Sequence, residues 1–266
     1  DLVLGRRAYL NRGGRRFAPG PWLGPAGAPA TSCAVGDVNQ DGRPDVFLGA
    51  ASARHGGLWI NHGGRPPALR RSPGLRPPGG GVWSRLLDLD SDGDLDLLLG
   101  RRDRTELWLN QARGAWIELG AAAGRALTRA GPAAAADLDG DHWPELVRPA
   151  GGGVRVAVPG GERELAHAVS LRLRGADGER PAVGARVELI LEGRPGQVQV
   201  RRVERPHGTV RFGTGGEVRV QQVRVRWPDG VWQRFEDLPV DRTVTLTRGG
   251  HARWRHDEPL GEAVEA

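Results

Sequence analysis

The sequence predicts an all-β protein: a partial β-propeller of about three and a half blades, followed by a small antiparallel β domain. Three observations predict this. An acidic motif recurs roughly every 50 residues, the apolar runs around it are strand-length, and apolar and polar residues alternate in the last third of the chain. The 42 glycines and 20 prolines among 266 residues also favour short strands and turns over long helices.

The strongest signal is a nine-residue acidic segment that occurs three times. The copies are Asp37–Asp45, Asp88–Asp96 and Asp137–Glu145, which begin 51 and 49 residues apart. Each precedes an apolar run, and in the first two copies a second apolar run ends on Asn61 or Asn110. Residues 1–11 repeat the back half of this unit. A unit of this length fits a blade of about four antiparallel strands, which buries its faces against neighbouring blades.

Aromatic residues share one position of the repeat. Trp59 and Trp108 are equivalent, and Tyr9 matches them in the first, incomplete copy. Packing between blades explains this recurrence better than a ligand-stacking site. The single cysteine, Cys33, excludes an intrachain disulfide framework, and we expect it to be a small buried residue.

The acidic segments have the ligand pattern of a Ca²⁺ loop. Side-chain oxygens stand at positions 1, 3, 5 and 9, and the carbonyl of position 7 adds a further oxygen. The predicted ligands are Asp37, Asn39, Asp41, Arg43 (carbonyl) and Asp45 in loop one; Asp88, Asp90, Asp92, Asp94 (carbonyl) and Asp96 in loop two; and Asp137, Asp139, Asp141, Trp143 (carbonyl) and Glu145 in loop three. A metal-free Asx-rich turn is the alternative, and three copies in register disfavour it.

The loops differ in their expected affinity for calcium. Loop two should bind most tightly, because it has four aspartates and Gly93 at the turn. Loop one replaces one carboxylate with Asn39. Loop three should be weakest, because His142 stands where a positive φ favours glycine. Since all three loops lie before residue 165, calcium should hardly affect the residues beyond it.

These residues resemble the FG-GAP/VCBS repeat family over roughly residues 1–160. The resemblance implies β-propeller blades with calcium loops of the kind seen at Asp88–Asp96. Propellers of that family usually have about seven blades.

The C-terminal region changes character, and period-two alternation predicts a separate antiparallel β domain at 165–250, followed by a charged tail at 251–266. Three segments are similar to the ASPIC/UnbV domain: Ala182–Val187, Val210–Gly215 and Val223–Gly230. With the preceding repeats they resemble secreted proteins of the cartilage acidic protein and UnbV type. Residues 179–181 depart from the usual family sequence, and the stretch before Phe212 is shortened.

Charge and hydropathy exclude two function classes. The net charge of +6 comes from 38 basic residues, all arginine, which are spread along the chain and interleaved with 32 carboxylates. A phosphate-binding surface needs its basic residues on one face, so we expect no nucleic-acid partner. No apolar stretch approaches the ~18 residues of a membrane-spanning helix. The sequence begins at Asp1 and lacks methionine, so we take it to be an internal piece that says nothing about a leader.

The search for catalytic motifs finds neither a phosphate-binding loop, a nucleophile elbow nor a zinc-protease helix. We therefore expect no catalytic residue, no organic cofactor and no enzyme activity. The sequence favours a calcium-binding extracellular module for adhesion or ligand binding, secreted or at the cell surface by family resemblance. The alternative is an accessory or catalytic part of a secreted enzyme acting on polysaccharide. The expected partner is an extracellular protein or an acidic glycan, the latter suggested by Arg172, Arg174, Arg219, Arg224 and Arg226 on alternating strand positions.

Overall fold

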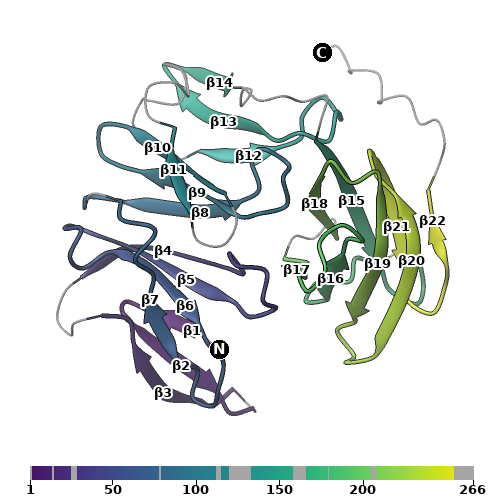
Figure 1. Ribbon diagram of the computed structural model, residues 1–266, viewed down its shortest axis with the longest axis horizontal. Coiled ribbons are helices and arrows are strands. Elements are labelled where there is room, and N and C mark those ends of the chain that lie inside the picture. The colour runs from purple at the N-terminus through teal and green to yellow at the C-terminus, as the bar shows by residue number, and fades with distance from the viewer. Residues whose placement is uncertain are drawn as a thin grey trace. The chain divides into compact units, whose positions relative to one another are not determined.

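The structure, a computed structural model, describes residues 2–13, 15–24, 29–77, 79–111, 115–119, 133–157, 166–178, 180–204 and 208–254. These residues form strands and turns only, which confirms the all-β prediction (Figure 1). None of them belongs to a helix long and apolar enough to cross a membrane. The chain divides into two compact units. The first holds residues 1–87, 94–134 and 146–158, and the second holds 88–93, 135–145 and 159–266.

Four antiparallel sheets follow one another in the repeat region. They contain β1 (Leu2–Leu4), β2 (Arg7–Asn11) and β3 (Phe17–Trp22); β4 (Ala30–Gly36), β5 (Asp45–Ala50), β6 (Gly57–Asn61) and β7 (Leu69–Arg71); β8 (Trp83–Leu87), β9 (Asp96–Gly100), β10 (Thr105–Asn110) and β11 (Trp116–Glu118); and β12 (Ala134–Ala136), β13 (Glu145–Ala150) and β14 (Gly153–Ala157). Each strand pairs with its chain neighbour, as in a propeller blade. Among the described residues the sheets do not close into a ring, so the propeller is partial. The count of three and a half blades stays a prediction.

The second strand of each complete blade is its most buried part. All six residues of β5 and all five of β9 are buried. Phe47 and Leu58 of one sheet share an apolar cluster with Leu97 and Leu99 of the next. Because both faces of these strands are buried, their sequences are short continuous apolar runs and do not alternate between apolar and polar residues.

The tryptophans at the shared repeat position lie in these blade cores, as expected. Trp59 is 4% exposed and packs with Leu23, Val46 and Leu48, while Trp108 packs against the neighbouring cluster. The expectation for Cys33 is wrong, because its side chain is exposed on β4. Successive side chains of a strand point to opposite faces, and Ala34 is the residue that packs against the core.

The C-terminal region forms two four-stranded sheets with the orders β18-β15-β21-β22 and β17-β16-β19-β20. Their strands are β15 (His167–Arg174), β16 (Arg186–Ile190), β17 (Gln199–Arg202), β18 (Thr209–Gly215), β19 (Arg219–Arg226), β20 (Trp232–Pro239), β21 (Arg242–Thr247) and β22 (Ala252–Arg253). The pairing is antiparallel, as predicted, except that β15 and β21 are parallel. Strand β22 lies within the residues that the sequence suggested as a tail.

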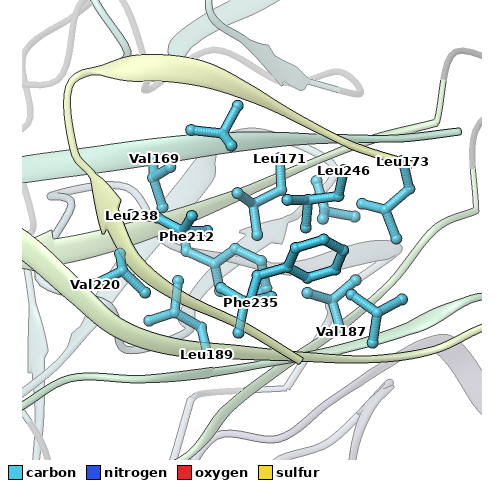
Figure 2. Packing of buried hydrophobic residues seen from close by; sticks show 14 of the residues in the cluster. Val169, Leu171, Leu173, Val187, Leu189, Phe212, Val220, Phe235, Leu238 and Leu246 are labelled. Atoms are coloured by element: carbon cyan, nitrogen blue, oxygen red, sulfur yellow. The ribbon is translucent and has the colours of Figure 1, made fainter. Parts of the chain in front are cut away.

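One apolar core lies between these two sheets (Figure 2). Leu171 of β15 and Phe212 of β18 come from one sheet, and Val187 of β16 and Phe235 of β20 come from the other. Burying each large apolar side chain stabilises the fold by about 1.5–3 kcal/mol. The Trp227–Gly230 segment forms a tight turn, in which the Gly230 N–H donates to the Trp227 carbonyl at 2.8 Å. The region is therefore a β-sandwich with its own core.

Candidate functional site

Each acidic loop joins the first and second strands of its sheet. The residues at positions 4 and 6 adopt left-handed backbone conformations in all three loops: Gln40 (φ 55°) and Gly42 (84°), Ser91 (61°) and Gly93 (94°), and Gly140 (79°) and His142 (68°). The positive φ expected at His142 is thus present. However, every loop holds one non-glycine residue in the left-handed region. This residue is at position 4 in loops one and two and at position 6 in loop three. Backbone strain therefore does not set loop three apart from the others.

The carboxylates of loop one form hydrogen bonds and an ion pair with other residues of the chain. Asp45 accepts hydrogen bonds from the Val38 N–H at 3.0 Å and from the Asn61 N–H at 2.8 Å. Burial raises the pKa of Asp45 to about 7, although these two N–H groups oppose the shift. Asp41 forms an ion pair with the guanidinium of Arg43 and accepts from the Asn39 amide. The described residues place no group of three acidic oxygens within 4.8 Å in this loop.

Loop two brings the carboxylates of Asp88, Asp90 and Asp96 within 4.8 Å of one another. Asp96 is fully buried and accepts from the Asn110 N–H at 2.9 Å. Asp88 is 7% exposed; its Oδ2 accepts from the Gly213 N–H at 2.8 Å, while its Oδ1 is buried without a hydrogen-bond partner. Burial raises the pKa of Asp90, and the neighbouring charge of Asp88 raises it further.

Loop three gathers Asp137, Asp139 and Glu145 in the same way. Glu145 is 3% exposed; its Oε2 accepts from the Leu138 N–H at 2.8 Å, and its Oε1 is buried without a partner. Asp137 accepts from the N–H groups of Gly140 at 2.7 Å and His142 at 3.1 Å. Loops two and three therefore share one arrangement, built from positions 1, 3 and 9.

The remaining predicted ligands are placed differently. Asp92 and Asp141, at position 5, are not part of the two described carboxylate groups. At position 7, the Asp94 carboxylate accepts from the Gln40 amide of loop one, and the Trp143 side chain is buried.

The residues of loops two and three fit a hard divalent cation. A buried carboxylate oxygen without a partner costs free energy, and each loop contains one, on Asp88 and on Glu145. Carboxylate oxygens so close together repel one another unless a cation lies between them. Ca²⁺ prefers such oxygen donors and tolerates irregular geometry, whereas Mg²⁺ demands octahedral geometry and retained water.

Sequence reasoning missed the two asparagines that support the loops. The N–H groups of Asn61 and Asn110 donate to Asp45 and Asp96 at position 9, at 2.8 and 2.9 Å. Their side-chain amides donate to the carbonyls of Pro44 at 3.2 Å and Leu95 at 3.3 Å, which are the residues before position 9. The signal was present, because both apolar runs end on asparagine at one repeat position.

Comparison with protein families gives one match in the repeat region and one in the C-terminal region. A model described as an FG-GAP-like repeat matches residues 4–48 and 88–147, and a model described as ASPIC and UnbV matches residues 175–253.

The chain combines FG-GAP-like repeats with an ASPIC and UnbV domain.

Comparison with curated proteins gives no match. A similar solved structure is described as the structural basis of specific recognition of non-reducing terminal N-acetylglucosamine by an Agrocybe aegerita lectin. It is 20% identical, the alignment covers 58% of this chain and 44% of that one, and the TM-score is 0.41. This chain thus matches less than half the length of that lectin chain.

The sequence suggested that five arginines of the ASPIC/UnbV domain form one outer face. The structure does not place them on one face. Arg172 and Arg174 lie on β15, whereas Arg219, Arg224 and Arg226 lie on β19 of the other sheet. Because the two sheets share one core, their outer faces point in opposite directions. Two of these residues are also paired: Arg219 with Asp237 at 3.0 Å and Arg224 with Glu188 at 2.8 Å. Alternation along single strands could not show which sheet each strand joins.

The outer face of the β17-β16-β19-β20 sheet carries a different basic feature. Arg202, Arg186 and Arg226 are cross-strand partners in register, and Trp232 continues the row beyond Arg226. Directly paired residues of antiparallel strands point to the same face. Arg202 and Arg226 are exposed, and Trp232 is 51% exposed. We call these four residues the arginine row.

Proposed function

We propose that this chain is a calcium-binding, non-catalytic interaction module of a secreted or cell-surface protein. FG-GAP-like repeats together with an ASPIC/UnbV domain suggest an extracellular interaction role. The observation that carries the calcium proposal is the pair of buried carboxylate oxygens without partners, on Asp88 and Glu145. Both lie in groups of three carboxylates that match the donor set of Ca²⁺.

With calcium bound, the loop residues would stabilise one conformation of each loop. Asp88, Asp90 and Asp96 would hold one ion, and Asp137, Asp139 and Glu145 a second. The bound ion supplies positive charge that offsets the repulsion among these carboxylates. The N–H groups from within the loops and from the strand ends hold the carboxylates in place beforehand. A surface that is fixed before it meets a partner loses less conformational entropy on binding.

Titration calorimetry of chelator-treated protein tests calcium binding. Extracellular modules bind Ca²⁺ with dissociation constants of about 0.1–1 mM, and we expect this range for loops two and three. Asp88→Asn should remove one binding event and Glu145→Gln a separate one. As a matched control, Asp237→Asn changes an exposed carboxylate of the ASPIC/UnbV domain and should leave calcium binding unchanged. Absence of binding heat up to about 10 mM Ca²⁺ would refute the proposal.

The proposed partner is an acidic glycan bound at the arginine row. Like charges directly opposite one another on a sheet are destabilising. Glu188 offsets part of this repulsion through its ion pair with Arg186 at 2.9 Å, and a bound anion would relieve the rest at the exposed Arg202 and Arg226. Guanidinium groups bind carboxylate and sulfate groups in a bidentate manner, and an exposed indole such as Trp232 offers a flat apolar face to a sugar ring. The arginine row combines both features along one line of the sheet.

Binding to dextran sulfate, with uncharged dextran as the matched probe, tests this partner. The chain should bind dextran sulfate in a salt-dependent manner and should not bind dextran. Arg226→Glu should weaken binding at least several-fold, while Arg172→Glu, on the opposite sheet, should have little effect. Equal losses in both variants would indicate non-specific charge attraction and contradict a site at the row. Turnover of either polysaccharide would contradict the non-catalytic proposal and favour a polysaccharide-acting enzyme.

A further inference from the structure

Strand β18 contains the Val210–Gly215 motif, which the proposed function leaves unused. Its side chains alternate between two faces of the sheet. Val210 and Phe212 are buried in the core of the sandwich. Arg211, Gly213 and Gly215 therefore lie on the opposite face of the strand. Every one of these three outward residues contacts an acidic loop that belongs to the same compact unit.

Arg211 joins both loops through its guanidinium. Its Nε donates to the carbonyl of His142 in loop three at 2.5 Å. Its Nη1 donates to the carbonyl of Asp88 in loop two at 3.3 Å, and its Nη2 donates to the Ser91 hydroxyl. None of these acceptors is a predicted ligand atom. The guanidinium thus fixes the backbone of both loops, and its Nη1 also forms a long ion pair with Asp88 Oδ2 at 4.0 Å, which leaves Asp88 Oδ1 available for an ion.

The electrostatic surroundings of Arg211 agree with this role. Burial lowers the pKa of the guanidinium, and the charges of Asp88, Asp137, Asp141 and Asp90 oppose that shift. Since these four carboxylates come from loops two and three, Arg211 lies in the negative potential of both. An arginine remains charged in such surroundings.

Gly213 and Gly215 allow the backbone of β18 to approach loop two closely. The Gly213 N–H donates to Asp88 Oδ2 at 2.8 Å, and the Gly215 N–H donates to the Ser91 carbonyl at 2.9 Å. A Cβ at residue 213 would lie 2.3 Å from Asp88 Oδ2 and 2.5 Å from the Ser91 carbonyl carbon. Only glycine fits at this position. The contact directs one oxygen of Asp88 to β18, and the other oxygen is the buried one without a partner.

We infer that the outward face of β18, formed by Arg211, Gly213 and Gly215, is a docking surface that holds acidic loops two and three and orients Asp88 toward its ion. Calcium binding and the stability of the ASPIC/UnbV sandwich are therefore coupled. Coupling of this kind is reciprocal, so calcium in the loops must also stabilise β18. The inference rests on the proposed calcium binding. It revises the expectation that calcium hardly affects residues beyond 165.

Hydrogen exchange of the unaltered chain, with chelator and with saturating calcium, tests the coupling directly. Calcium should slow exchange of the Gly213 and Gly215 amides, because their acceptors belong to loop two. The Gly230 amide, which donates within the Trp227–Gly230 turn, serves as the internal control and should not change. Calorimetry on the same sample separates the two proposals. Calcium binding without protection of Gly213 and Gly215 would overturn the coupling alone, and absence of binding would overturn both.

Gly213→Ala provides a second test that leaves the charge unchanged. Substitutions that disturb the support of a metal ligand typically weaken metal affinity by about 10–100-fold, and we expect at least tenfold at loop two. Arg211→Gln should speed exchange of both loops, whereas Arg172→Gln on the adjacent β15 should not. Wild-type affinity in folded Gly213→Ala, with unchanged loop exchange in Arg211→Gln, would contradict the inference.

Discussion

The side-chain amide of Asn110 donates to the carbonyl of Val38 at 2.8 Å, and so connects two successive repeats through residues that are 72 positions apart in the chain. The same amide donates to the Leu95 carbonyl at 3.3 Å, and Asn110 is fully buried. Its repeat equivalent, Asn61, donates to Pro44 in an exposed position. One repeat position therefore supports its own loop in both blades, but only Asn110 also reaches the preceding loop.

Asn110→Ala should destabilise the chain more than Asn61→Ala. Removing the amide leaves buried carbonyls without donors, which costs about 1–3 kcal/mol. Asn61→Ala should cost less than about 1 kcal/mol, because water can replace the lost bond. The free energies of unfolding from urea titrations of both variants check this. Equal losses would show that the contact with Val38 adds nothing.

Arg43→Ala should increase the calcium affinity of loop one. The Arg43 guanidinium forms an ion pair with Asp41, which is one of the predicted ligands of loop one. Removing this competing cation should tighten binding several-fold, while the position 7 carbonyl remains. Calorimetry in an Asp88→Asn, Glu145→Gln background isolates loop one. Unchanged or weaker binding there would contradict the prediction.

His142→Gly should stabilise the chain. A non-glycine residue in the left-handed region destabilises the folded state by about 1–2 kcal/mol. Glycine also has more conformational freedom in the unfolded chain, which reduces the gain in stability by about 0.4–1 kcal/mol. We therefore expect a gain of about 0.5–1 kcal/mol, measured by urea denaturation in chelator. Gly140→Ala, two residues earlier at a φ of 79°, is the matched variant and should be destabilising.

Calcium should raise the thermal stability of the chain. At about 1 mM Ca²⁺ and a dissociation constant of about 0.1 mM, each occupied site adds about 1.4 kcal/mol. Differential scanning calorimetry in chelator and in calcium measures this change. Equal melting temperatures under the two conditions would contradict it.

Asp229 should make the ASPIC/UnbV domain sensitive to acid. Its carboxylate accepts from the Val231 N–H at 3.1 Å and from Arg248 Nε at 2.8 Å, and the Val231 bond chiefly lowers its pKa below the usual 3.8. This contribution to stability is present above about pH 4 and is lost as the pH falls through the lower, folded-state pKa. Asp229→Asn should reduce the fall in stability between about pH 4 and 2, as measured by circular dichroism. An unchanged acid profile would contradict the prediction.

The repeat pattern by itself determined much of this protein. The spacing of the acidic segments and the short apolar runs predicted sheets with strands joined by Ca²⁺-type loops, because strand length and turn chemistry are local properties of the chain. The period-two alternation of apolar and polar residues in 165–250 likewise predicted an antiparallel β domain. These features need no long-range contact to be recognised.

Tertiary structure decided which residues meet. The sequence could not show that Arg211 reaches Asp88 and His142, which lie 123 and 69 residues earlier in the chain. Nor could it divide the arginines of β15 and β19 between two opposite faces. Side-chain alternation fixes which residues share a face of one strand, but the pairing and packing of strands fix what that face contacts, and these depend on burial of apolar surface across the whole domain.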